Sequence, residues 1–252
     1  SSEKIIFVWP EGILPDISQE ELKQYSSLFH QNFNEKHLFV IGINNKVINP
    51  SSVNYFNSLS VYDYELNVLS SYNKINLVPF GEFLPFENIL KVIGLKPLTN
   101  SYQSFSKGKT REVIEIELQN STIKILPLIC YEIIYSGKLF NNSNFDFIIN
   151  ISEDGWFGKS IGPQQHFEHS ILRAIENGKY IVRSSNNGIA AIINPIGVVE
   201  QSVDFGKSGY VELMEMRKIQ PTIFSKYGNK IFGLLILLYI LLIFSFNKIK
   251  NE

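Results

Sequence analysis

The segment TIKILPLICYEIIYSG, residues 122–137, holds the only cysteine of the 252-residue chain. Residues 122–129 are rich in apolar and β-branched side chains, which predicts a buried strand, and residues 130–137 can turn into a helix. A strand that runs directly into a helix exposes the side chain at the corner and gathers backbone N–H groups where an oxyanion can form. Cys130 is therefore a candidate nucleophile. The alternative is a small buried apolar side chain, the commonest state of a lone cysteine.

Further β-rich runs lie on both sides of this corner, separated by clusters of Asn, Ser, Gly and Pro. The expected strands are residues 5–8, 37–44, 55–61, 64–71, 112–118, 122–129, 145–151, 179–184, 189–194 and 209–213. Residues 18–34 start with a Ser and a Glu spaced as in a capping box, which predicts a helix. Residues 163–177 start with Pro and are followed by Gly, as helices often are. Strands joined by hairpins and helices indicate a layered α/β sandwich.

Composition limits the possible functions. A chain of this length fits one large core, and a formal net charge of -1 provides no basic field for nucleic acid. A single cysteine excludes an internal disulfide, and the sequence has no Cys/His cluster typical of zinc. His166 and His169 are three residues apart on one predicted helix, but no third ligand is evident, so we interpret both as structural. We expect neither a metal nor a cofactor.

Two other ionisable residues follow predicted strands. Glu11 comes after residues 5–8 in VWPEG, where partial desolvation would suit a general base, although it can equally be an ordinary polar strand end. Lys74 follows residues 64–71 and precedes a Pro- and Gly-rich loop. Most lysines are solvated surface charges, but an ammonium near a thiolate favours the thiolate and stabilises an oxyanion. Position alone leaves both interpretations open for each residue.

In order and spacing, Glu11, Lys74 and Cys130 resemble the Glu-Lys-Cys triad of the nitrilase, or carbon-nitrogen hydrolase, superfamily, with separations of 63 and 56 residues. Within that superfamily the chain is most similar to the apolipoprotein N-acyltransferase family. The similar segments are NKINLVPFGEFLPF (residues 73–86), PLICYE (127–132), DGWFGKSIGPQQHFEHSILRAIENGKYIVRSSNNGIAAIINPIG (154–197) and PTIFSKYG (221–228). The resemblance covers nearly the whole chain and implies a nitrilase-like α-β-β-α sandwich over residues 1–222.

The resemblance also implies two acyl transfers through a thioester. Cys130 would attack an acyl ester of a phospholipid and release a lysophospholipid. Glu11 would be the general base, and Lys74 with the backbone N–H of Tyr131 would stabilise the oxyanion. The acceptor would be the α-amino group of the diacylglyceryl-cysteine of an apolipoprotein. The implied location is the bacterial inner membrane, with the catalytic domain on the periplasmic side.

Other residues match positions that the family keeps near the triad. Glu82 in PFGE would orient the triad lysine, and Glu132 follows the nucleophile in CYE; the alternative is that both anchor loops. Trp156 and Phe157 in DGWFG would form a wall of the acyl pocket, although such aromatic residues are more often part of a core. Glu153 departs from the family, which commonly has Asn there, so we expect different local hydrogen bonding.

Residues 231–246, IFGLLILLYILLIFSF, form an uncharged apolar run with lysines on both sides. Extended to residues 227–247, a helix rising ~1.5 Å per residue approaches the ~30 Å thickness of the hydrocarbon core. We therefore predict a transmembrane helix over residues 227–247, followed by a short tail, residues 248–252. A buried C-terminal core helix is the alternative. Because lysines lie at both ends, the positive-inside rule gives no orientation.

The chain begins only a few residues before the strand predicted at residues 5–8. In the family, another strand and helix of the domain, and several membrane helices, come before it. Because residues 5–8 are wholly apolar, we expect a neighbouring strand on each edge of this strand. Without the preceding strand, one edge would be unpaired, and the isolated chain would be inactive or unstable. An inactive remnant of the acyltransferase is thus one alternative function. The other is a nitrilase-fold amidase that releases its acyl group to water from a small substrate.

Overall fold

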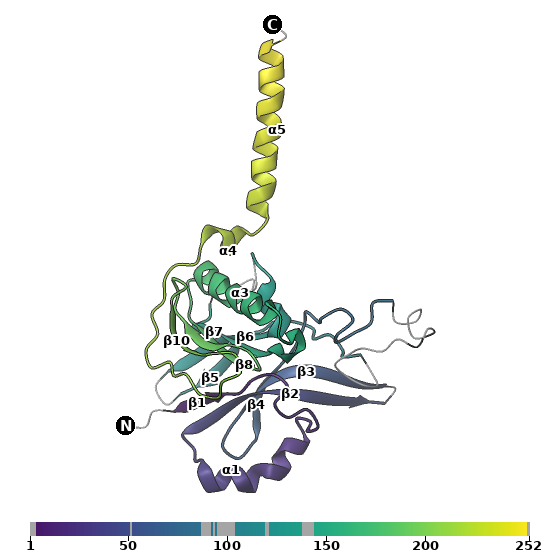
Figure 1. Ribbon diagram of the computed structural model, residues 1–252, viewed down its shortest axis with the longest axis vertical. Helices are drawn as coiled ribbons and strands as arrows, with labels where there is room; N and C mark the ends of the chain where they lie inside the picture. Colours follow the sequence, from purple (N-terminus) through teal and green to yellow (C-terminus); the bar gives the residue numbers. More distant parts are fainter. Residues whose placement is uncertain are drawn as a thin grey trace.

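The computed structural model describes residues 4–50, 52–86, 92, 94, 104–118, 121–137 and 144–250, with the backbone alone for 247–250. The last two residues of the predicted tail, 251–252, lie outside the described residues. Two β-sheets stack face to face, and helices cover the outer face of each sheet (Figure 1). This arrangement confirms the predicted α-β-β-α sandwich.

Within the described residues, the first sheet has four strands in the order β1-β2-β3-β4. Their bounds are β1 (Ile5–Val8), β2 (His37–Asn49), β3 (Ser52–Tyr62) and β4 (Val68–Asn73). Strand β1 is parallel to β2, and the other neighbours are antiparallel. The outer face is covered by the 3₁₀-helix η1 (Glu21–Tyr25) and by α1 (Ser26–Asn32). The helix predicted at residues 18–34 is therefore present as two shorter segments.

The second sheet, as far as the structure describes the chain, has six strands in the order β10-β9-β8-β7-β6-β5. Their bounds are β5 (Ile114–Glu117), β6 (Thr122–Ile129), β7 (Phe147–Glu153), β8 (Ile181–Asn186), β9 (Ala190–Ile193) and β10 (Val199–Val203). The central strands β6, β7 and β8 are parallel. Helix α3 (Gly162–Asn177) covers the outer face, with Pro in its first turn and Gly178 in a left-handed conformation at its end, as the sequence predicted.

Alternation along β2 shows how the layers are built. Leu38 and Val40 face the second sheet, while Phe39 and Ile41 face the side covered by α1. All four are buried, because successive side chains of a strand point to opposite faces and both faces are covered. Sheets with two covered faces therefore account for the nearly continuous apolar runs seen in the sequence.

Residues 5–8 form the predicted strand, β1. Within the described part of the chain, β1 pairs with β2 only and lies at the edge of its sheet. Ile6 and Val8 pack into the core between the sheets, Phe7 packs into the outer core, and Ile5 is half exposed. The all-apolar sequence of β1 thus reflects two covered faces, which are independent of whether both edges are paired.

The strand predicted at residues 209–213 is absent, and β10 takes the last position in the second sheet instead. The side chain of Asn194 accepts hydrogen bonds from the backbone N–H groups two and four residues later, and this closes a hairpin into β10. Residues 209–213 run alongside β10. There, the side chain of Gln201 makes two hydrogen bonds to the backbone of Glu212, in place of the backbone-to-backbone hydrogen bonds of a strand pair.

A turn after β3 sets where β4 begins. The Asp63 carboxylate accepts hydrogen bonds from the backbone N–H groups of Glu65 and Asn67, so the chain turns before β4 starts at Val68. The strand predicted at residues 64–71 is therefore shifted toward the C-terminus. Strand β4 ends at Asn73, so the next side chain, that of Lys74, lies at the end of the sheet.

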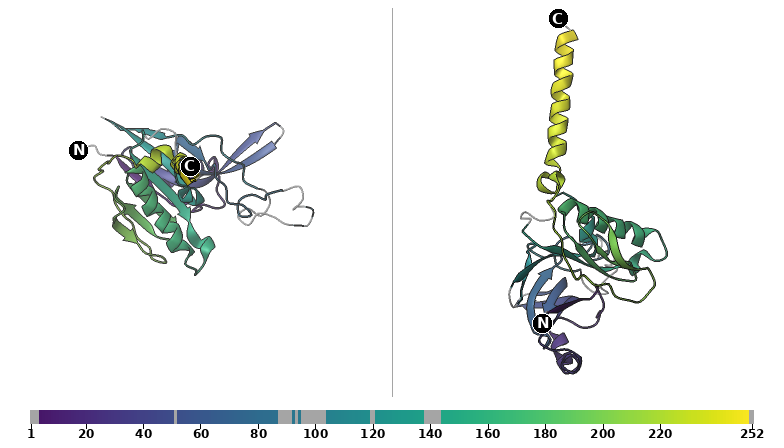
Figure 2. Two further views of the ribbon diagram at one scale, coloured as in Figure 1. Left: turned by 90° about the horizontal axis from the view of Figure 1, so that it is seen from above. Right: turned by 90° about the vertical axis from the view of Figure 1, so that its left-hand side faces the viewer.

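The C-terminal segment consists of α4 (Ile223–Tyr227) and α5 (Lys230–Lys250), separated at Gly228, which has a positive φ of 53°. Helix α5 projects away from the sandwich in Figure 1 and in the right-hand view of Figure 2. Its large apolar side chains are exposed up to residue 246. Judged on the described residues, the structure contains no helix that combines the length and the hydropathy needed to span a membrane.

Candidate active site

Strand β6 ends directly at Cys130, the first residue of the 3₁₀-helix η2 (Cys130–Ile134). Cys130 has a φ of 48°, in the left-handed region, where a non-glycine residue costs about 1–3 kcal/mol. Cys130 is buried and lines a cavity of about 890 Å³. The predicted strand-to-helix corner is confirmed, and it presents the thiol to this cavity.

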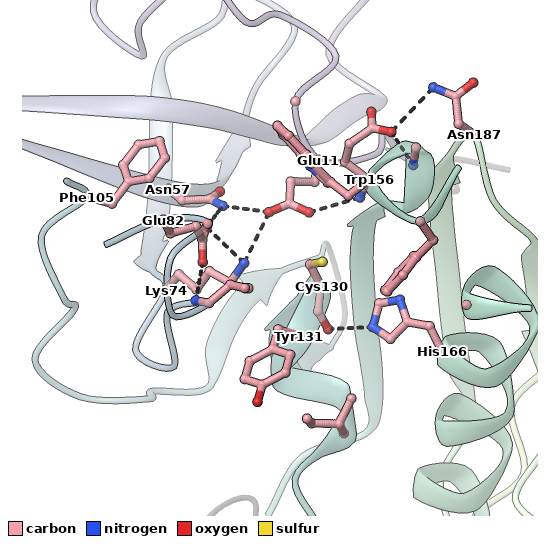
Figure 3. Close-up of a pocket in the computed structure, with 18 of the residues that line it drawn as sticks. Glu11, Asn57, Lys74, Glu82, Phe105, Cys130, Tyr131, Trp156, His166 and Asn187 are labelled. Atoms are coloured by element: carbon pink, nitrogen blue, oxygen red, sulfur yellow. Dashed lines mark hydrogen bonds and ion pairs between the residues drawn. The ribbon is translucent and has the colours of Figure 1, made fainter. Parts of the chain in front are cut away.

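Lys74 and two carboxylates line the same cavity (Figure 3). The Lys74 ammonium is 3.3 Å from Glu11 Oε1 and 3.0 Å from Glu82 Oε1. All three residues are buried, with Lys74 only 1% exposed. Lys74 follows β4, Glu11 follows β1, and Glu82 lies in the loop after Lys74. The structure therefore brings Glu11, Lys74 and Cys130 together from three separate parts of the sequence.

Asn57 of β3 completes this group, and we did not predict it. Its Nδ2 donates to Glu11 Oε1 at 2.6 Å and to Glu82 Oε1 at 2.7 Å, so it bridges the two carboxylates. We call Glu11, Asn57, Lys74 and Glu82 the Lys74 cluster. Nothing in the sequence distinguishes Asn57 from the other Asn and Ser residues of β3, because a buried amide is recognised only by the partners that the fold supplies.

Burial and charge act differently on the lysine and the cysteine. Burial alone would lower the pKa of Lys74, but the negative charges of Glu11 and Glu82 outweigh it and raise the pKa above its ordinary value. Burial, and then the negative charge of Glu11, raise the pKa of Cys130 to about 12, although the Lys74 charge opposes this change. The free protein thus holds a lysine ammonium beside a neutral thiol.

Glu132 is completely buried and is a structural centre of the site. Its carboxylate accepts hydrogen bonds from Tyr72 (2.7 Å), Arg111 (2.7 Å) and the backbone N–H of Ile129 (3.0 Å). It also accepts the backbone N–H groups of the two residues after Lys74, at 3.0 and 3.1 Å. Glu132 therefore ties the segment that follows Lys74 to the corner that carries the cysteine. Arg111, its ion-pair partner, was not predicted from the sequence.

The rest of the cavity wall is largely apolar. Tyr131, Trp156 and Phe157 line it, with Trp156 59% and Phe157 39% exposed. The other apolar lining residues include Leu14, Pro15, Ile43, Val78, Phe80, Phe105 and Ile134. A cavity with an apolar wall and a few convergent polar groups is typical of a small-molecule or lipid-chain site.

Glu153, the residue that departs from the family pattern, has its own set of partners. Its carboxylate accepts hydrogen bonds from the backbone N–H of Gly155 at 2.7 Å and from the side chains of Asn186 and Asn187. Its backbone N–H donates to Glu11 Oε2 at 2.9 Å. The unusual side chain is therefore accommodated locally, and the contact to Glu11 comes from the main chain, which any residue except proline provides.

Comparison with known proteins places these features in a family. The carbon-nitrogen hydrolase family matches the chain over residues 6–212. Curated apolipoprotein N-acyltransferases from Bradyrhizobium diazoefficiens and Rickettsia prowazekii are 39% and 36% identical to it, over 74% and 98% of this chain. The matches cover 34% and 49% of those relatives, so the chain spans half or less of their length.

Solved structures show the same fold at low sequence identity. Nit3 of Saccharomyces cerevisiae, a member of the nitrilase superfamily, has a TM-score of 0.55 at 16% identity, covering 81% of this chain and 73% of its own. An amidase from Nesterenkonia sp. AN1 has a TM-score of 0.50 at 14% identity, covering 79% of this chain and 76% of its own. At these identities the similarity concerns the fold alone.

Proposed function

The chain belongs to the carbon-nitrogen hydrolase family, and on that premise we propose that it carries the thiol acyl-transfer centre of an apolipoprotein N-acyltransferase. The observation that carries this proposal is the convergence of Glu11, Lys74 and Cys130 on one cavity with an apolar wall. Similarity to curated N-acyltransferases over nearly the full chain supports this choice within the family.

In the first step the Cys130 thiol attacks the ester carbonyl of a phospholipid acyl chain. Because the pKa of Cys130 is raised to about 12, the thiol must lose its proton as the C–S bond forms. We assign Glu11 as the base that accepts this proton. The protonated carboxyl of Glu11 then gives the proton to the oxygen of the departing lysophospholipid, and an acyl thioester remains on Cys130.

Negative charge develops on the carbonyl oxygen during this attack. We assign its stabilisation to the Lys74 ammonium and the backbone N–H of Tyr131. The raised pKa of Lys74 ensures that it carries a positive charge at neutral pH. Its fixed position costs no reorganisation during the reaction, and oxyanion stabilisation of this kind is usually a large part of catalysis. Glu82 holds the ammonium in place, and Asn57 in turn holds Glu82.

In the second step the neutral α-amine of an apolipoprotein diacylglyceryl-cysteine attacks the thioester carbonyl. Glu11 takes a proton from the attacking nitrogen and returns it to the departing Cys130 sulfur. An amide forms, the C–S bond breaks, and the thiol is restored. A thioester suits both steps, because it forms from an oxygen ester and reacts readily with amines. No cofactor is required.

The substrates place this reaction at a membrane, which we propose to be the bacterial inner membrane, with the sandwich on the periplasmic side. Helix α5 supports this proposal, since its apolar side chains are exposed all round. Such a surface is unfavourable in water. We propose that residues 227–247 enter the bilayer, that residues 1–222 form the catalytic domain, and that Trp156 and Phe157 contact the acyl chain.

The amine acceptor separates this function from hydrolysis. The protein is first loaded with a labelled phospholipid in vesicles, and a synthetic diacylglyceryl-cysteine peptide is then added. We expect the label to move to the peptide α-amine much faster than to water, with release of one lysophospholipid per acyl group. Rapid release of free fatty acid that is unaffected by the peptide would instead indicate a hydrolase.

A further inference from the structure

His166 lies on the other side of Cys130 from Lys74 (Figure 3) and belongs to a second buried polar group. We call this group the Asp154 cluster. It consists of residues from β7, η3 (Asp154–Phe157), α3 and β8, namely Ser152, Asp154, His166, Arg183 and Ser185. Asp154 and Arg183 are completely buried, and His166 is 4% exposed. The proposed mechanism uses none of these side chains, so their presence beside the nucleophile requires an explanation.

Asp154 acts purely as a hydrogen-bond acceptor. Its Oδ1 is 2.8 Å from His166 Nδ1 and accepts the Ser152 hydroxyl at 2.7 Å. Its Oδ2 accepts from Arg183 at 2.7 Å and from Ser185 at 3.0 Å. Burial by itself would raise the pKa of Asp154, but the His166 hydrogen bond and the Arg183 charge outweigh burial and hold the pKa well below its ordinary value. Asp154 is therefore a carboxylate.

The other edge of the His166 ring meets the nucleophile. Nε2 lies 3.2 Å from the carbonyl oxygen of Cys130, and a carbonyl oxygen can only accept. Nδ1 faces the Asp154 carboxylate, which also only accepts. Arg183 approaches Nδ1 at 3.3 Å, farther than the 2.8 Å contact with the carboxylate. Each ring nitrogen therefore needs its own proton, and this makes the ring an imidazolium.

The charge of the two clusters supports the same protonation state. The Lys74 cluster contains two carboxylates and one ammonium, which gives a net charge of -1. In the Asp154 cluster, Asp154 and Arg183 cancel each other. A protonated His166 brings the sum to zero, whereas a neutral ring would leave one uncompensated negative charge in a buried region.

We propose that His166 is a positioning residue for the nucleophile, an imidazolium that Asp154 orients and that clamps the backbone carbonyl of Cys130. The clamp acts on the residue that must hold the left-handed φ of 48°. A residue in this region is strained and persists only where its surroundings fix it. His166 thereby keeps the thiol aimed at the Lys74 cluster. This inference rests on the proposed role of Cys130 as nucleophile.

The surroundings of His166 define what can alter its charge. Asp154 of η3 and Arg183 of β8 contact the ring directly. His169 lies one turn further along α3, where burial and then Arg173 lower its pKa, so it is neutral and does not compete for the proton. Phe157 packs against the ring, with centroids 5.5 Å apart. Asp154 is thus the only carboxylate among these neighbours, and it favours the charged ring.

Two substitutions separate positioning from packing. In H166Q the side-chain amide can reach the Nε2 position and donate to the Cys130 carbonyl, while in H166N it reaches only the Nδ1 position beside Asp154. H30Q, on the distant helix α1, is the matched control. We expect kcat for acyl transfer, and the rate of Cys130 alkylation by iodoacetamide, to fall about 10²-fold in H166N. H166Q should recover much of this loss, KM should not change, and H30Q should match the unmodified protein.

Equal losses in H166Q and H166N, or a change confined to KM, would overturn the proposal. The second measurement is a proton–nitrogen correlation spectrum of the histidine rings in the unmodified protein at neutral pH, assigned with the H166Q spectrum. The spectrum should show a proton on each ring nitrogen of His166. An unprotonated ring nitrogen would also overturn the proposal.

If H166Q fails to fold, single substitutions of the other three histidines assign the His166 signals by elimination. Neither alkylation nor the spectrum requires phospholipid. Failure of the proposed function would therefore be seen separately, as absence of acyl transfer in the unmodified protein.

Discussion

The Lys74 cluster and the Asp154 cluster are both buried polar groups beside Cys130, but they differ in what they face. Lys74, Glu11 and Glu82 line the cavity, and their net charge is -1. In the Asp154 cluster His166 also lines the cavity, but Asp154 and Arg183 have no exposed surface, and each carboxylate oxygen of Asp154 has two hydrogen-bond partners. We infer from this difference that the Lys74 cluster performs chemistry, while Asp154 and Arg183 hold the framework.

The largest effect should come from removing the nucleophile. C130S should abolish acyl-enzyme formation and leave the fold intact, because a serine hydroxyl is far less acidic than a thiol, whose ordinary pKa is ~8.5. Acylation is measured by mass, and folding by circular dichroism. Appreciable turnover by C130S would remove Cys130 from its assigned role.

The next largest effect is expected from K74R, which tests the Lys74 cluster. It keeps the positive charge but replaces a compact ammonium by a planar guanidinium, which cannot occupy the same position between Glu11 and Glu82. We expect kcat to fall by on the order of 10² or more, the scale for loss of one oxyanion donor. K230R, at the start of α5, is the control, and kinetics of K74R equal to those of K230R would contradict the assignment.

D154N tests the Asp154 cluster and should lower the stability of the folded protein. It leaves Arg183 as an uncompensated buried charge, which should cost about 3–5 kcal/mol of unfolding free energy. D146N, which removes the more exposed Asp146–Lys218 pair, should cost no more than about 1 kcal/mol. Denaturant titration compares the two, and equal losses would show that the Asp154 cluster is not a framework.

The acid dependence of stability sharpens the same comparison. The pKa of Asp154 is lower in the folded protein than in the unfolded chain, where it is ~3.9. The carboxylate therefore stabilises the fold above about pH 4, and this stabilisation is lost as the pH falls below that value. Stability of the unmodified protein should therefore decline below about pH 4, and D154N should remove part of this decline. A D154N curve parallel to that of the unmodified protein would contradict this origin.

Much of the fold was predictable because its signals are local. The apolar run of β6 ending at Cys130 predicts a strand and a corner, and the Pro and Gly around α3 predict both of its ends. Which strands pair with β1 cannot be predicted from its apolar composition. Burial of Ile6 and Phe7 depends on covered faces, while edge pairing depends on which other strand lies alongside.

The candidate site likewise contains residues that the sequence predicted and residues that it did not. Cys130, Lys74 and Glu11 each end or follow a predicted strand, and their order resembles a known triad. Asn57 and Arg183 carry no such signal, because their roles depend on partners 25 or more residues away in sequence. A buried amide or guanidinium looks like any polar residue until the fold supplies those partners.

Trp156 should show the smallest effect. Because Trp156 lines the cavity and is 59% exposed, W156A removes contact with a substrate chain and little core packing. We expect KM for a long-chain phospholipid to rise about ten-fold or less, equivalent to ~1.4 kcal/mol, with kcat nearly unchanged. A short-chain donor is the control. An equal change for both donors would place Trp156 outside the acyl pocket.

Thioester formation on Cys130 is tested most simply by a peptide-resolved mass measurement of the protein after incubation with phospholipid vesicles and no amine acceptor. We expect one acyl group attached to the peptide that contains Cys130, removable by neutral hydroxylamine as a thioester and absent in C130S. An acyl group on another residue, or an unmodified Cys130 under conditions in which the protein transfers acyl chains, would contradict the proposed mechanism.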